Sequence, residues 1–150
     1  MTDIAIEHDR KASWPYWVIT PLALLWNGFG AYDYVMSQTS GADYMRRMGM
    51  GDAQVAYMTH LPAWMVGCWA IGVWGAVAGS VLLAIRSRWA LHAFLVSLAG
   101  MVVNFAYGPL TADGAAAMTQ KVAVMDGVLL AIGLLLAGYA WAMTKRGVLR

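Results

Sequence analysis

Two carboxylates lie inside segments that are otherwise apolar and uncharged. Asp33 lies near the end of Trp17–Met36, and Asp126 lies near the start of Val122–Met143. A carboxylate inside a membrane is costly and by default marks a solute or proton pathway. Because each lies within about two helical turns of a segment end, the alternative is that both reach the hydrated headgroup zone. The sequence leaves both interpretations open.

Asp33 carries a further constraint, because it lies in the last turn of its predicted helix. The helix dipole is negative at that end and disfavours a carboxylate. We therefore predict that a basic side chain of the following outer loop pairs with it. The candidates are Arg46, Arg47 and His60.

Other polar side chains recur at helical spacing in the apolar segments. Asn27 lies near the middle of its segment, and Asn104 precedes Tyr107 by one helical turn. We expect Asn27, Asp33, Asn104, Tyr107 and Asp126 to converge on one outward-facing polar pocket. The alternative is a structural role, in which amides inside the bilayer hydrogen-bond across helix interfaces.

Small residues form a strip along the segment Pro62–Ile85. The strip comprises Gly72, Gly75, Gly79 and Ser80, and it includes a Gly-x-x-x-Gly pair. Such strips allow two helices to approach closely in lipid. The pattern predicts a helix-packing face, whose partner is a helix of the same chain or of another copy.

The loop before this segment is rich in methionine and ends on a histidine. Thioether and imidazole groups together suit Cu(I), although an amphipathic interfacial turn produces the same pattern. The residues concerned are Met45, Met48, Met50, Met58 and His60. We assign no metal site to them.

The sequence contains no motif of an enzyme or of a cofactor site. His60 and His92 begin different segments at opposite membrane faces, so they cannot ligate one haem iron together. No Walker loop, HExxH, CxxC or Ser-His-Asp arrangement occurs. The single cysteine, Cys68, excludes an intramolecular disulfide. We therefore expect neither an enzyme nor a bound cofactor.

The elements that must position these residues follow from the composition. The chain has 150 residues, of which 61% are hydrophobic and 12% are charged, against about 45–50% and about 25% in soluble domains. Too little charge remains to cover a soluble globule. The net charge of +2 comes without a basic patch, which excludes nucleic acid as a partner. The expected partner is the lipid bilayer.

Four apolar segments are long enough to cross a bilayer, since about 20 helical residues span its hydrocarbon core. The predicted helices cover residues 14–36, 62–85, 90–107 and 114–143. The predicted fold class is all-α, an antiparallel four-helix transmembrane bundle. It forms a single integral membrane domain over residues 1–150.

Local signals predict where these helices begin and end. Ser13 and Asp113 each suit a helix N-cap, and Pro62 suits a first turn. Gly108 and Pro109 are expected to end the third helix.

Basic residues predict the orientation, because cytoplasmic loops carry an excess of Lys and Arg. With both termini in the cytoplasm, seven basic residues lie inside and three lie outside. The inner set is Arg10, Lys11, Arg86, Arg88, Lys145, Arg146 and Arg150, and the outer set is Arg46, Arg47 and Lys121.

Three stretches of the chain resemble a group of small four-helix bacterial inner-membrane proteins, largely uncharacterised and often labelled sugar transporters. The stretches are Leu22–Tyr34 (LALLWNGFGAYDY), Pro62–Trp64 (PAW) and Gly72–Ala90 (GVWGAVAGSVLLAIRSRWA). The resemblance implies the topology and a transport-like role. It supplies no defined binding residues to carry over.

Two function classes follow from these observations. The first is transport or permeation of a small polar solute by a homo-oligomer, with the pathway between copies because a bundle this thin has no room inside. The second is a non-catalytic accessory or scaffolding subunit of a larger membrane complex, in which the same polar residues hold helices together.

Overall fold

The computed structural model of the protein describes residues 14–150 and is all-helical over that range, which confirms the all-α prediction. Four helices are long: α1 (Trp14–Thr39), α4 (Ala63–Ala84), α5 (Trp89–Leu110) and α7 (Gln120–Lys145). Three are short: α2 (Gly41–Arg47), α3 (Asp52–Thr59) and α6 (Ala112–Ala117). The predicted cap Ser13 and the basic residues Arg10 and Lys11 lie outside the described residues.

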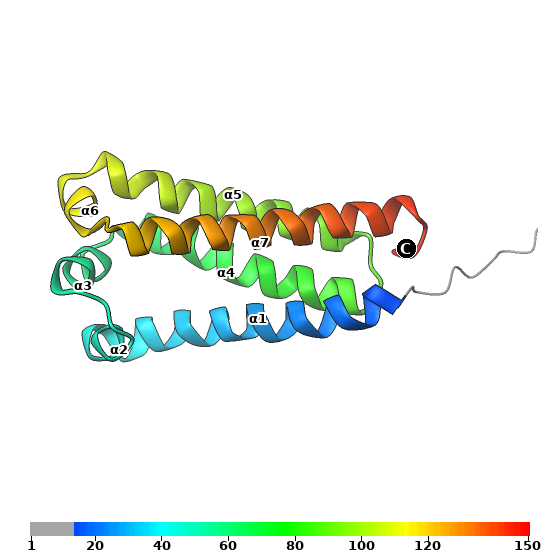
Figure 1. Ribbon diagram of the computed structural model, residues 1–150, viewed down its shortest axis with the longest axis horizontal. Helices are drawn as coiled ribbons and strands as arrows, with labels where there is room; N and C mark the ends of the chain where they lie inside the picture. The colour runs from blue at the N-terminus through cyan, green and yellow to red at the C-terminus, as the bar shows by residue number, and fades with distance from the viewer. Residues whose placement is uncertain (1–13) are drawn as a thin grey trace, which may run out of the picture.

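The long helices lie lengthwise beside one another, and the short helices gather at one end (Figure 1). We call α2, α3 and α6 the cap, and the opposite end, where α4 turns into α5, the hairpin end. Helix α4 packs against both α1 and α5, and α7 packs against α5. Within the cap, α3 contacts α2 and α6. The principal contacts therefore run in the order α1, α4, α5, α7.

Three of the long helices, α4, α5 and α7, are long and apolar enough to cross a membrane. Helix α1 is not among these three, although it is as long as α7. Asn27, Asp33 and several indole and phenol rings lower its mean hydropathy. Three helices of the described chain thus have the length and apolar composition of membrane spans, and the fourth span stays a prediction.

Two helix boundaries differ from the predicted ones. Helix α5 continues through Pro109 to Leu110, because a proline in the last turn removes only one backbone hydrogen bond. The predicted single helix from residue 114 is instead divided into α6 and α7. Asp113 caps neither helix: the Thr111 hydroxyl accepts the Gly114 N–H, and the Thr119 hydroxyl accepts the Val122 N–H.

The packing of α4 on α5 brings the two backbones unusually close. A Cβ atom on Gly100 would lie 2.7 Å from the Cys68 carbonyl oxygen, and one on Gly75 would lie 3.0 Å from the Ser97 Cβ. The Ser97 hydroxyl donates to the Gly72 carbonyl across the same interface. The small-residue strip of α4 therefore packs on a helix of its own chain.

At the hairpin end, Tyr16 of α1 closes the last turn of α4. Its hydroxyl contacts the carbonyls of Leu83 at 2.8 Å and Ala84 at 2.9 Å in the last turn of α4, where the Leu83 carbonyl also accepts the Arg86 N–H. Arg86 follows with a φ of 61° and places its guanidinium over the Tyr16 ring, 5.5 Å from the centroid. This contact fixes the start of α1 to the end of α4.

The last residues of the chain pack on the same turn. The Arg150 N–H donates to the Arg86 carbonyl at 2.7 Å, and the Arg88 N–H donates to the Arg150 carbonyl at 2.8 Å. Val148 and Leu149, just before Arg150, are buried in the hydrophobic core. The hairpin end is therefore held together by α1, the α4–α5 turn and the chain after α7.

We predict that Gly100→Ala destabilises the protein by about 1–3 kcal/mol, the usual cost of overpacking a tight interface. The matched control is Gly67→Ala in α4, where an added Cβ meets nothing within 4 Å. The control should be neutral or more stable, because alanine favours a helix over glycine. Unfolding in mixed detergent micelles measures both variants. Equal stabilities would contradict the backbone contact.

Candidate functional site

Asn27, near the middle of α1, holds α1 against α4. Its Nδ2 donates to the Ser80 hydroxyl at 2.7 Å, and this hydroxyl donates to the Ala76 carbonyl at 2.9 Å. Ser80 has no exposed surface. Ser80 therefore serves the α1 interface, whereas Gly72, Gly75 and Gly79 serve the α5 interface.

Asn104 and Tyr107, on α5, both turn toward the beginning of α4. Asn104 Nδ2 donates to the carbonyl of the buried Met65 at 3.4 Å. The Tyr107 ring stacks edge-on against Trp64, with 5.2 Å between centroids. Both side chains thus contribute to helix packing near the cap.

Asp33 bonds to the Tyr44 hydroxyl, so the prediction that a basic side chain pairs with it is wrong. Its Oδ1 accepts the Tyr44 hydroxyl at 2.9 Å, which ties α1 to the cap helix α2. Arg46 pairs with Asp52 at 3.4 Å, and His60 Nδ1 donates to the Ala56 carbonyl at 2.7 Å. A neutral donor satisfies the carboxylate without bringing a second charge into the partly buried end of the helix.

Arg47, the other candidate partner of Asp33, donates from Nε to the Asp43 carbonyl at 3.3 Å within its own helix. In the sequence, the charge of the α2 arginines favours them as partners of Asp33. The residue that bonds to Asp33 is instead Tyr44, which lies two and three residues before these arginines. Aromatic residues in short helices at the membrane boundary usually serve packing. The position of Tyr44 in the sequence therefore did not predict that it bonds to Asp33.

Tyr44 is nearly fully buried, with 6% of its surface exposed. Burial raises the pKa of its hydroxyl to about 12, and the hydrogen bond to Asp33 adds to the shift because it keeps the phenol protonated. The Asp33–Tyr44 pair is thus a fixed donor–acceptor contact at neutral pH.

A small polar recess of about 110 Å³ lies where α3, α5 and α6 meet. The polar side chains that line it are Tyr57, His60, Tyr107, Thr111 and Asp113. Its volume is well below the about 300–1,000 Å³ of ordinary ligand sites. The recess has room for water or a very small solute.

Asp126 of α7 lies close enough to this recess to influence it. Burial raises the pKa of the Tyr57 hydroxyl, and the nearby Tyr107 hydroxyl and Asp126 carboxylate raise it further. Of the five residues predicted to line one polar pocket, Tyr107 lines this recess, and Asp126 lies near enough to Tyr57 to act on its hydroxyl. Asn27, Asp33 and Asn104 bond to the Ser80 hydroxyl, the Tyr44 hydroxyl and the Met65 carbonyl.

Tyr57, Thr111 and Asp113 were not predicted as part of a site, and His60 was considered as a partner of Asp33 and beside the loop methionines. They come from two short helices and the turns beside them, whose docking on one another depends on contacts distant in sequence. The one available signal was the concentration of polar and aromatic residues next to Pro62 and Pro109.

The methionine-rich loop folds into α2 and α3. Met45 is buried with 2% of its surface exposed, whereas Met48 is 47% exposed. His60 directs Nδ1 to a backbone carbonyl. Across residues 14–150, no group of three or more His, Cys, Asp or Glu side chains could hold a metal ion.

We predict that Asn27→Ala and Ser80→Ala are coupled in a double-mutant cycle by about 0.5–2 kcal/mol, the range of interhelical hydrogen bonds in membranes. The control cycle combines Asn27→Ala with Ser97→Ala, a buried serine whose hydrogen bond crosses the other face of α4. That pair shares no partner and should be additive. Equal coupling in both cycles would contradict a direct bond.

We also predict that the stabilisation of the folded protein by Tyr44 is lost at alkaline pH. Its pKa is raised from 10.0 to about 12 on folding, so the folded state favours the protonated phenol. Its contribution is complete below pH 10 and is lost as the pH rises toward 12. The difference in thermal midpoint between the wild type and Tyr44→Phe should therefore shrink over this window. A difference that stays constant would refute the assignment.

No protein-family model matches the chain, and comparisons with curated proteins and with solved structures give no match either. The resemblance to small bacterial inner-membrane proteins therefore stays a prediction.

Proposed function

We propose that this protein is a non-catalytic integral membrane subunit that docks another membrane protein through α4. The first support is the use of its polar side chains. Asn27, Ser80 and Ser97 each bond to a neighbouring helix of the same chain. Side chains engaged in this way hold helices and are not free to contact a solute.

The second support, which carries the proposal, is one exposed face of α4. The side chains of this face recur at spacings of four and three residues, as in a helix-packing seam. They are Gly67, Ile71, Trp74, Ala78 and Val81, and all five are exposed. The seam runs over 15 residues, from Gly67 to Val81, which is about 21 Å at the rise of a helix. It is long enough to receive a transmembrane helix.

Trp74 lies in the middle of this α4 seam, and 48% of its surface is exposed. Tryptophan in membrane proteins is normally enriched at the two membrane–water boundaries, where its N–H meets polar groups. At the centre of a span, an exposed indole suits a protein partner better than hydrocarbon. Gly67 and Ala78 on the same face leave space for a neighbouring backbone.

The seam fits a helix of a different protein better than a second copy. In a two-fold contact between copies, residues at the centre of the interface meet themselves. Trp74 would then face the second copy's Trp74, with a bulky residue on both sides. A foreign helix that presents a small residue at this level would accept the indole.

The proposal includes the finer predictions of topology. Helix α1 completes an antiparallel four-helix transmembrane bundle in a bacterial inner membrane, with both termini cytoplasmic. The distribution of basic residues supports this orientation, because cytoplasmic ends carry more of them. Five lie at the hairpin end and three at the cap: Arg86, Arg88, Lys145, Arg146 and Arg150 against Arg46, Arg47 and Lys121.

A second candidate function is permeation of a small polar solute between copies of the chain. The polar recess favours it, because two phenols, an imidazole and the Asp113 carboxylate line it at the cap end of the candidate span α5, and Asp126 acts on one of the phenols. In this candidate, Asp126 contacts the solute or a proton.

A photo-crosslinking residue at Trp74 in native membranes tests the proposed function. The matched control is the same residue at Leu135, an exposed position of α7 outside the seam. We expect a discrete adduct with one other polypeptide from position 74 and none from position 135. Trp74→Ala should abolish copurification of that polypeptide, whereas Leu135→Ala should retain it.

Two results would overturn this proposal. Adducts that are absent from position 74, or equally abundant from both positions, would show that α4 faces lipid. An adduct of two chains of 16.3 kDa each would show self-association and favour permeation by a homo-oligomer.

A further inference from the structure

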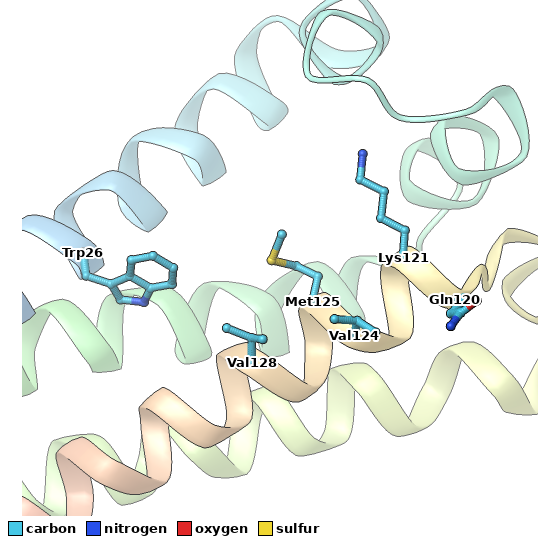
Figure 2. Close-up of a pocket in the computed structure, with 6 residues that line it drawn as sticks. All are labelled: Trp26, Gln120, Lys121, Val124, Met125 and Val128. Carbon is cyan, nitrogen blue, oxygen red and sulfur yellow. The ribbon is translucent and has the colours of Figure 1, made fainter.

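A second feature, separate from the α4 seam, is an apolar groove between α1 and α7. It has a volume of about 600 Å³ and is lined by Trp26, Gln120, Lys121, Val124, Met125 and Val128. Figure 2 shows Trp26 on α1 facing Met125 and Val128 across the gap, with Lys121 at the end nearer the cap. This volume falls within the about 300–1,000 Å³ of small-molecule sites.

The α7 wall of the groove is a continuous apolar stripe below one cation. Lys121, Val124, Met125 and Val128 lie at spacings of three, one and three residues, which places them on one helix face. From Lys121 to Val128 the stripe is about 10 Å long at the rise of a helix. One leaflet of the hydrocarbon core is about 15 Å thick, half of the whole core. The groove thus fits within a single leaflet.

Toward the hairpin end, α1 and α7 contribute to one hydrophobic core. Tyr16 and Ala23 of α1 belong to the same core as Ala137 and Ala140 of α7. The residues that line the groove, Trp26 and five residues of α7 between positions 120 and 128, lie on the cap side of this core. The lined part of the groove is therefore shorter than a helix that crosses the whole bilayer.

The charge at the mouth of the groove is not neutralised within the described chain. Lys121 is exposed, and the ion pair found among residues 14–150 joins Arg46 to Asp52. The Lys121 side chain extends from the first turn of α7 into the space beneath the cap (Figure 2). An ammonium group at the membrane boundary above an apolar slot complements an anionic headgroup above an acyl chain.

We propose that the groove between α1 and α7 binds one anionic phospholipid. An acyl chain lies along Val124, Met125 and Val128 against the Trp26 ring, and the headgroup phosphate lies at Lys121. The one-leaflet length and the cation at one end distinguish this occupant from a transmembrane helix of a second copy, which would need a groove as long as the bilayer is thick.

Native mass spectrometry of the full chain tests the proposal, with phosphatidylglycerol and phosphatidylcholine of identical acyl chains as probes. We expect the wild type to prefer one phosphatidylglycerol, and Lys121→Gln to lose about fivefold of that preference, the discrimination that one basic side chain supplies. The matched control is Lys145→Gln, which removes the same charge beside Trp141 at the other end of α7. It should keep the preference.

A second pair of variants tests the acyl slot independently of charge. Val128→Phe fills the groove and should reduce retention of both lipids, whereas Leu135→Phe adds the same bulk elsewhere on α7 and should not. The proposal is overturned if Lys121→Gln and Lys145→Gln lose the preference equally, if neither loses it, or if Val128→Phe retains lipid as the wild type does. None of these results depends on whether α4 binds a protein partner.

Discussion

The close contact between α4 and α5 is the constraint on which the rest of the structure depends. In lipid, helices gain no hydrophobic free energy by packing together, so association relies on van der Waals contact and hydrogen bonds. Gly75 and Gly100 bring the two backbones within contact distance, and the Ser97 hydroxyl bonds across the gap. Helix α1 then adds to the free side of α4, and α7 adds to the free side of α5.

Helices α1 and α7 are held against the α4–α5 pair by different kinds of interaction. Helix α1 is bound at three levels by polar contacts: Tyr16 at the hairpin end, Asn27 in the middle and Asp33 at the cap. Helix α7 relies on apolar packing. Only 6% of its most apolar stretch is buried inside the molecule, whereas 28% of the corresponding stretch of α4 is buried. The polar residues that made α1 the least apolar of the long helices are therefore the residues that fix its position.

Much of the fold could be predicted from the sequence, because composition and segment length report directly on a membrane environment. The all-α class and the glycine strip of α4 follow from local pattern. The partners of polar groups do not: Asp33 pairs with Tyr44 through the docking of a seven-residue helix, and Thr119 rather than Asp113 caps α7. Asn27 and Asn104 likewise bond to Ser80 and to the Met65 carbonyl, partners that are set by how α1 and α5 pack on α4 and not by local sequence pattern.

The cap links the helices at one end of the molecule. Helices α2 and α3 connect α1 to α4, helix α6 connects α5 to α7, and α3 packs against α6. These connections hold the two outer helices through the cap, whereas the hairpin end draws Tyr16 and Ala140 into one core. The groove lies between these two ends, with most of its apolar lining on α7 and with Lys121 on the side of the cap (Figure 2). A groove that opens toward Lys121 faces the side from which a headgroup, but not a complete helix, can approach.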